Sequence, residues 1–162
     1  MSITKITPCL WFNDQAEEAA QFYTSIFKDS KINHIQRWTD EAGKSRVIMA
    51  SFELNRQTFT ALNGGPQFTF NEAISFQIDC ADQEEVDHYW NKLNKGGDEG
   101  QQRCGWLADK FGVSWQVVPR EMKQYLGGPD VEGAKRARAA MMGMKKLDIA
   151  ELKKAYDGEY HR

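Results

Sequence analysis

Cysteine and histidine are the side chains best suited to act as nucleophiles, bases or metal ligands, and this sequence of 162 residues holds three of each. Cys104 is the one candidate nucleophile, because Lys110 follows it closely and an ammonium group can stabilise a thiolate. No histidine stands near Cys104 in the sequence, and a buried cysteine more often packs as a small apolar residue. Cys104 is therefore the single catalytic candidate, with structural packing as the alternative.

The remaining cysteines and the histidines do not form a recognisable metal site. Cys9 and Cys80 are far from each other and from Cys104, and no C-x-x-C motif occurs, so we expect reduced thiols rather than disulfides or a zinc site. His34, His88 and His161 each stand alone. We expect them to be surface or hydrogen-bonded histidines.

The elements that would position these residues follow a repeated pattern, a short strand and then a capped helix. The apolar run 6–12 is followed by Asp14, and the alternating run 74–78 is followed by Asp82, at an offset of 68 residues. Each aspartate has a glutamate three residues later, which is typical of a capped helix start. Apolar residues then recur at helical spacing, so the sequence predicts two strand-helix units.

Each predicted helix is followed by strand candidates and a closing turn. The first unit has candidates at 32–38, 46–54 and 57–62 and closes at 63–66. The second has candidates around 100–108 and 113–118 and closes at Pro119. Modules of about 60 residues bury little core alone, so we expect the two to pair their sheets around a shared interior.

The C-terminal stretch has a different composition, rich in Ala, Arg and Met over residues 131–142, which predicts a helix. Asp148 can cap a last helix. We expect this helical extension to cover a sheet or a dimer partner. The predicted organisation is an α+β domain over residues 1–128, built from modules 3–66 and 73–120, and an extension over residues 129–162.

Composition excludes several classes of protein. Nine Phe, five Trp and five Tyr supply far more apolar surface than a disordered chain carries. A net charge of -2 from 21 basic and 23 acidic residues provides no basic field for nucleic acid. No stretch approaches the ~20 apolar residues that cross a bilayer, and the start does not resemble a signal peptide. We therefore expect a cytoplasmic protein that binds neither nucleic acid nor membrane.

Three segments carry a resemblance to a known family: residues 6–12 (ITPCLWF), 63–66 (NGGP) and 104–119 (CGWLADKFGVSWQVVP). They resemble the PhnB-like branch of the glyoxalase, bleomycin-resistance and extradiol-dioxygenase (vicinal oxygen chelate) superfamily, a branch often labelled 3-demethylubiquinone-9 3-methyltransferase. The resemblance spans about residues 3–158. It implies two βαβββ modules whose curved sheets form a glyoxalase-like cup around a small-molecule pocket. We also expect a homodimer.

Enzymes of that superfamily usually hold a divalent metal with His, Glu or Gln from the first and last strands of each module. The resemblance places Thr7 and Ser75 at the first-strand positions and Gln116 on the last strand of the second module, while residues 57–63 contain no Glu or His. A neutral hydroxyl binds a divalent cation far more weakly than imidazole or carboxylate. We therefore predict neither a metal nor another cofactor, and a metal-dependent lyase or dioxygenase is the alternative.

The methyltransferase label implies a site for S-adenosylmethionine, which usually lies on a glycine-rich turn after the first strand of a doubly wound sheet. Here the first predicted strand is followed by Asn13 and Asp14, and the glycine pairs of the chain form no G-x-G motif. The label is therefore not matched by a cofactor motif.

Strand alternation predicts which side chains line the pocket. Thr7, Cys9 and Trp11 share one side of their strand, and Ser114 and Gln116 point away from Trp115. Aromatic surface combined with hydroxyl and amide groups is typical of a small-molecule site. Alternatively, these aromatic residues fill a dry core, or the protein is a purely structural dimer; substrate, reaction and catalysis stay open. The predicted ligand-binding residues are Thr7, Trp11, Asn63, Ser75, Trp106 and Gln116.

Overall fold

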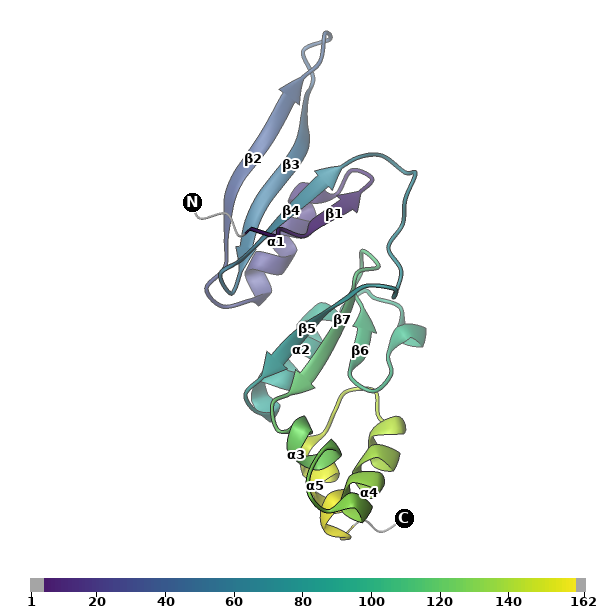
Figure 1. Ribbon diagram of the computed structural model, residues 1–162. Coiled ribbons are helices and arrows are strands. Elements are labelled where there is room, and N and C mark those ends of the chain that lie inside the picture. The colour runs from purple at the N-terminus through teal and green to yellow at the C-terminus, as the bar shows by residue number, and fades with distance from the viewer. Residues whose placement is uncertain (1–4, 160–162) are drawn as a thin grey trace. The chain divides into compact units, whose positions relative to one another are not determined.

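The computed structural model describes residues 5–159 and divides into two compact units, Met1–Phe70 and Asn71–Arg162 (Figure 1). Each unit has its own sheet, and the α+β class predicted from the sequence is confirmed. None of the described helices combines the length and apolar character needed to cross a membrane. His161 lies outside the described residues.

From residue 5 onward, the first unit contains one helix and a four-stranded sheet with the order β1-β4-β3-β2. β1 runs parallel to β4, whereas β3 is antiparallel to both of its neighbours. The strands predicted at 32–38, 46–54 and 57–62 are confirmed. The elements are β1 (Cys9–Phe12), α1 (Ala16–Ile26), β2 (Lys31–Thr39), β3 (Ser45–Leu54) and β4 (Gln57–Asn63).

The core of the first unit lies between α1 and one face of this sheet (Figure 1). The ring of Tyr23 on α1 stacks on Phe52, with centroids 6.1 Å apart, and Phe52 stacks on Phe59 at 5.6 Å. All three side chains are buried, and burial of a large aromatic side chain contributes about 2 kcal/mol. Ala19 and Ala20 are fully buried, so small side chains allow the helix to approach the sheet closely.

The start of α1 corrects the sequence prediction. Asp14 does not cap the helix; the N-cap position is Gln15, whose side chain makes no capping hydrogen bond. Instead, the Ala16 backbone N–H donates to Oδ1 of Asn63 over 2.8 Å, and Asn63 belongs to β4. A helix start needs an acceptor for its unpaired N–H groups, and here a neighbouring strand supplies one of them.

The second unit contains a three-stranded sheet with the order β5-β7-β6, in which β5 runs parallel to β7. The resemblance implies a βαβββ module, but residues 71–120 form β-α-β-β, one strand fewer. The strand expected around 100–108 is only three residues long, because a 3-10 turn occupies the first part of that segment. The elements are β5 (Ser75–Cys80), α2 (Gln83–Leu93), η1 (Glu99–Gln101), β6 (Trp106–Ala108) and β7 (Ser114–Pro119).

α2 covers one face of this sheet, and its start confirms the sequence prediction. The side chain of Asp82 accepts a hydrogen bond from the Glu85 backbone N–H at 2.9 Å. Alternate residues of the strands and one stripe of the helix form the buried core. These residues are Ile78, Cys80, Leu107, Trp115 and Val117 from the strands and Val86, Trp90 and Leu93 from the helix.

Up to residue 159, three helices follow β7, whereas the sequence predicts two. α4 (Val131–Met142) and α5 (Ile149–Asp157) are the predicted pair, and the Asp148 side chain caps α5 by accepting from the Glu151 backbone N–H. The additional helix is α3 (Met122–Leu126), which is a little over one turn long. The three helices share a core of their own, made by Met122, Tyr125, Ala137, Leu147 and Leu152.

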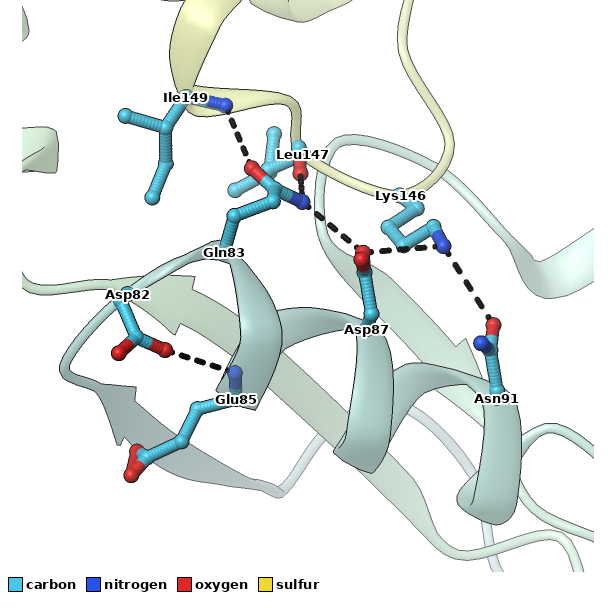
Figure 2. A network of polar contacts seen from close by, with 8 residues as sticks. All are labelled: Asp82, Gln83, Glu85, Asp87, Asn91, Lys146, Leu147 and Ile149. Atoms are coloured by element: carbon cyan, nitrogen blue, oxygen red, sulfur yellow. Dashed lines mark hydrogen bonds and ion pairs between the residues drawn. The ribbon is translucent and has the colours of Figure 1, made fainter.

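The side chain of Gln83, at the start of α2, forms hydrogen bonds that join the extension to the second module (Figure 2). Its Oε1 accepts from the Ile149 N–H at 2.8 Å, and its Nε2 donates to the Leu147 carbonyl at 3.1 Å. Nε2 also donates to Asp87 Oδ1 at 3.0 Å, and Lys146 Nζ lies 3.1 Å from the same carboxylate. The hydrogen bond from Gln83 and the ammonium of Lys146 lower the pKa of Asp87 below its usual value.

Candidate functional site

The second sheet has one face that α2 does not cover, and polar side chains gather there. The register pairs Ser75 with Ser114 and Gln77 with Gln116, so these four residues share that face. Trp115 points to the α2 side, where it is buried. The predicted opposition of Ser114 and Gln116 to Trp115 is therefore confirmed.

Three of the predicted ligand-binding residues lie together on this open face. Gln116 Nε2 donates to Ser75 Oγ at 2.9 Å, across the parallel pair of strands. Trp106 on β6 is the direct cross-strand partner of Gln116 on its other side. All three side chains are half-buried, so the sheet presents an amide, a hydroxyl and an indole side by side.

The indole of Trp106 differs from two other indoles of the chain in its hydrogen bonding. Trp11 Nε1 donates to the Gly65 carbonyl at 2.9 Å, and Trp115 Nε1 donates to Asp109 Oδ2 at 2.9 Å. Trp106 Nε1 has no acceptor among residues 5–159. A half-buried indole N–H without a protein partner can donate to a ligand.

In the first unit, Trp11 is held in place by the turn that follows β4. Besides the bond to Gly65, its ring lies directly over Gly64, where an added Cβ would overlap the indole. The edge of Phe68 completes the contact at 4.9 Å between ring centroids. Thr7 is half-buried and lies just before β1, outside the strand.

Asn63 lies on the other face of the first sheet. It pairs with Phe12, and both belong to the α1 side, whereas the neighbouring Trp11 points away from the helix. Its Oδ1 accepts from Ala16 and its Nδ2 donates to the Val47 carbonyl at 3.0 Å. Both polar groups of Asn63 therefore have structural partners, and its contact with a ligand stays a prediction.

Sequence reasoning missed two threonines on the open face of the first sheet. The two strands correspond when their ends, Asn63 and Pro119, are aligned. In this alignment Thr58 takes the position of Ser114, and Thr60 takes the position of Gln116. Thr58 and Ser114 are both buried, at 2% and 5% exposure. Applying the repeat to the last strands, and not only to the first, would have identified these positions.

Cys104 lies in a tight turn, where its backbone connects the second module to the extension. It has a φ of 51°, and its N–H donates to the Met144 carbonyl at 2.8 Å. Its half-buried Sγ lies 3.9 Å from Met142 Sδ. Cys80, in contrast, is fully buried, and burial raises the pKa of its thiol to about 12. A nucleophilic role for Cys104 stays a prediction.

The residues at the usual metal-binding positions do not fit a divalent cation. They carry hydroxyl and amide groups, which are poor replacements for imidazole and carboxylate. Within residues 5–159, no cluster of three or more His, Cys, Asp or Glu side chains could hold a metal ion. The donor set therefore disagrees with the metal that the resemblance implies.

An S-adenosylmethionine site of the doubly wound type does not fit either. β1 leads into α1 through Asn13, Asp14 and Gln15, without a glycine-rich turn. Each sheet combines one parallel pair with antiparallel neighbours, whereas such a cofactor site lies on a mostly parallel sheet with helices on both faces.

Comparison with known families now identifies the chain. Residues 4–118 match the model of a family described as 3-demethylubiquinone-9 3-methyltransferase. The chain belongs to this family. The predicted PhnB-like resemblance is therefore confirmed, and residues from 119 onward, which include the helices α3, α4 and α5, lie beyond the match. A search of curated proteins found no significant match.

One solved structure gives the same answer, and others are similar to a lesser degree. The PhnB protein of Bacillus cereus is 40% identical, with a TM-score of 0.63, over 72% of this chain and 99% of that one. Protein PA1353 of Pseudomonas aeruginosa is 18% identical, with a TM-score of 0.57, over 72% and 97% of the two chains, and supports the fold alone. A glyoxylase/bleomycin resistance protein/dioxygenase domain from Frankia sp. EAN1pec is 18% identical, with a TM-score of 0.45, over 73% and 93%.

Proposed function

We propose that this family member binds a small apolar or aromatic molecule on the open face of its second sheet, without a resident metal. The observation that carries the proposal is the hydrogen-bonded pair of Ser75 and Gln116 beside the indole N–H of Trp106, which has no acceptor in the described part of the chain. A flat aromatic surface next to a few fixed polar groups is the usual composition of a small-molecule site.

The three side chains have distinct tasks in this proposal. The bond to Ser75 fixes the amide of Gln116 in one orientation, because its Nε2 is the donor and its Oε1 is then an acceptor directed elsewhere. Gln77 Nε2 donates to Gln116 Oε1 over 3.4 Å, which is a long hydrogen bond that a ligand donor could replace. The Trp106 ring would cover the apolar body of the ligand while its N–H donates to an oxygen of it.

A metal-free site follows from the chemistry of the donors. Thr7, Ser75 and Gln116 offer neutral oxygen atoms, which compete poorly with water for Zn²⁺ or a similar ion. Metal analysis of the purified protein tests this part of the proposal. One equivalent of a bound divalent ion per chain would overturn it and favour a metal-dependent lyase or dioxygenase.

Ligand binding is tested by a thermal-shift titration with 1-naphthol and 1,4-naphthoquinone, two aromatic molecules with an oxygen atom at the ring edge. We expect a ligand-dependent rise of Tm in the wild-type protein, because a ligand that binds only the folded state stabilises it. Trp106→Ala and Gln116→Leu should reduce the shift several-fold. Trp38→Ala removes an indole that is 57% exposed on β2 and is the matched control.

Two outcomes of this titration would contradict the proposal. One is the absence of any shift with either compound up to millimolar concentration, which favours a filled core. The other is an equal reduction of the ligand-dependent Tm shift in Trp38→Ala and Trp106→Ala, which would show that binding does not depend on the open face of the second sheet.

The homodimer and the cytoplasmic location predicted from the sequence remain proposals. Family membership supports the homodimer, and multi-angle light scattering of the purified chain measures it directly. A mass of one chain, 18.6 kDa, at micromolar concentration would overturn it. Fractionation of cells that produce the full chain tests the location.

A further inference from the structure

A cavity lies within the second unit, and Ser75, Gln116 and Trp106 are not among its lining residues. It has a volume of about 790 Å³ and opens between the carboxyl ends of β5 and β7 and the helix α3. That volume is within the range of cavities that hold small organic ligands. Its α3 side is built from residues beyond those that match the family model.

One wall of this cavity is apolar. Val118 belongs to the open face of β7, and Met122 and Leu126 lie one helical turn apart on the same side of α3. Val118 and Leu126 are half-buried and pack against the core that the three helices share, so this core supports the wall. These three side chains offer a continuous surface for a hydrocarbon group.

The rim of the cavity is cationic. Arg120 is positioned by two bonds: its backbone N–H donates to the Cys80 carbonyl at 2.7 Å, and its Nε donates to Asp79 Oδ2 at 3.1 Å. Both terminal NH₂ groups of Arg120 remain without an acceptor among the described residues. The ammonium of Lys123, also on the rim, has no hydrogen bond or ion pair within residues 5–159 either.

Arg120 is positioned so that its guanidinium group can bind an anion. A carboxylate engages the guanidinium through Nε, which leaves the two terminal nitrogens to form a two-pronged contact with another planar oxyanion. With Arg120 and Lys123 against Asp79, the rim keeps one net positive charge for such a group.

We propose that this cavity binds a small monocarboxylate with an apolar tail. The carboxylate would contact the terminal nitrogens of Arg120 and the ammonium of Lys123, and the tail would lie along Val118, Met122 and Leu126. This site is additional to the one under Proposed function: Gln77 lines both, whereas Ser75, Trp106 and Gln116 do not line this cavity.

The experiment is a calorimetric titration of the full chain with sodium octanoate, with 1-octanol and sodium acetate as matched probes. Octanol keeps the tail without the charge, and acetate keeps the charge without the tail. We expect octanoate to bind roughly tenfold more tightly than octanol, because charge-assisted hydrogen bonds form only with the carboxylate. Acetate should bind at least about tenfold more weakly than octanoate, since it buries almost no hydrocarbon.

The variant Arg120→Gln/Lys123→Gln should lower octanoate affinity to that of octanol. Both side chains are exposed, so the fold is retained, which far-UV circular dichroism can verify. Arg138→Gln on α4 removes an exposed arginine away from the cavity and is the control, with unchanged affinity expected.

Equal affinity for octanoate and octanol, or an unchanged affinity for octanoate in the double variant, would overturn the proposal. So would the absence of octanoate binding at millimolar concentration. Trp106→Ala separates the two sites: octanoate binding should persist in it, while naphthol binding should persist in the Arg120 and Lys123 variant. Loss of octanoate binding in folded Trp106→Ala would mean a single site and overturn the second one.

Discussion

Asn63 at the end of β4 and Pro119 at the end of β7 occupy corresponding positions in the two modules. The 68-residue offset relates Phe12 to Cys80, and the two parallel pairs join Phe12 to Asn63 and Cys80 to Pro119. Asn63 supplies an acceptor for the start of α1, whereas proline has no polar side chain and α2 is capped by its own Asp82. The unpaired N–H groups at a helix start need acceptors, and a neighbouring strand can supply one when the adjacent sequence does not.

The next pair of corresponding positions shows a second contrast. In the first module, the Trp11 ring packs on Gly64 and closes the end of the sheet with an apolar contact. In the second, the same positions hold Asp79 and Arg120, an ion pair of 3.1 Å whose side chains are 66% and 65% exposed. The second module therefore has an exposed ion pair where the first has an apolar contact, and the cavity beside α3 lies at this end. The end of the first sheet also borders a cavity, but on its α1 side, where Glu17, Asn63 and Gly64 line it.

The largest expected effect comes from breaking the closed end of the first module. Gly64→Ala places a Cβ inside the Trp11 ring, so the indole must move and give up its bond to Gly65. We expect a loss of about 3 kcal/mol in unfolding free energy, at the upper end of overpacking effects. Urea denaturation followed by residue-resolved hydrogen exchange measures it and assigns the loss to the first unit.

The control for this substitution is Gly143→Ala, where φ is -92° and the nearest atom lies 3.7 Å from an added Cβ. It should change the free energy of unfolding by less than about 0.5 kcal/mol. If Gly64→Ala were as mild as this control, the apolar closure of the first module would not be a structural requirement.

A smaller effect tests the two ways of capping. Asn63→Ala removes the acceptor of Ala16 and the donor to Val47, and should cost about 2 kcal/mol. Asp82→Ala removes the local cap of α2 alone and should cost about 1 kcal/mol. Hydrogen exchange should report the first loss in α1 together with β3 and β4, and the second only in the first turn of α2. Equal losses of protection, confined to the start of α1 in one variant and of α2 in the other, would contradict this difference between a distant and a local cap.

The smallest effect concerns Asp87, which joins α2 to the extension. Its pKa is lowered in the folded protein, so the stabilisation is present above the unfolded pKa, about 3.9, and is lost as the pH falls through the folded value. We expect less than about 1 kcal/mol, because the carboxylate is 45% exposed. Urea unfolding at pH 7 and pH 3 should show a smaller pH dependence in Asp87→Asn than in the wild type.

Glu84→Gln changes an exposed carboxylate on the same helix and is the control for Asp87→Asn. It should leave the difference between pH 7 and pH 3 close to the wild-type value. An equal reduction in both variants would mean that the charge of α2 in general, and not the contact with Lys146, sets the pH dependence.

The sequence predicts those features that depend on neighbouring residues. The caps at Asp82 and Asp148 were predicted because a side chain and its partner N–H lie three residues apart. The prediction of Asp14 was wrong because the acceptor for α1 lies 47 residues away, and no local pattern reveals it. α3 was missed because five residues are too few for a helical period to be visible.

The same limit applies to the candidate site. Strand alternation was sufficient to predict the opposition of Gln116 to Trp115, and the family resemblance selected Ser75. The contacts of Gln83 with Leu147 and Ile149 could not be predicted, because they join residues 64 and 66 positions apart through main-chain atoms. The sequence did not indicate Arg120 as a candidate, because a single arginine outside any periodic pattern or motif is not distinguished from other surface residues.

The distant cap of α1 has a consequence for the order in which the chain folds. The start of α2 is completed by residues three positions apart, so its first turn can form as soon as that segment is synthesised. The start of α1 must wait until β4 has joined the sheet, because Asn63 arrives 47 residues later. Contacts between distant residues form more slowly than local ones, so we expect α2 to gain protection from hydrogen exchange before α1 during refolding.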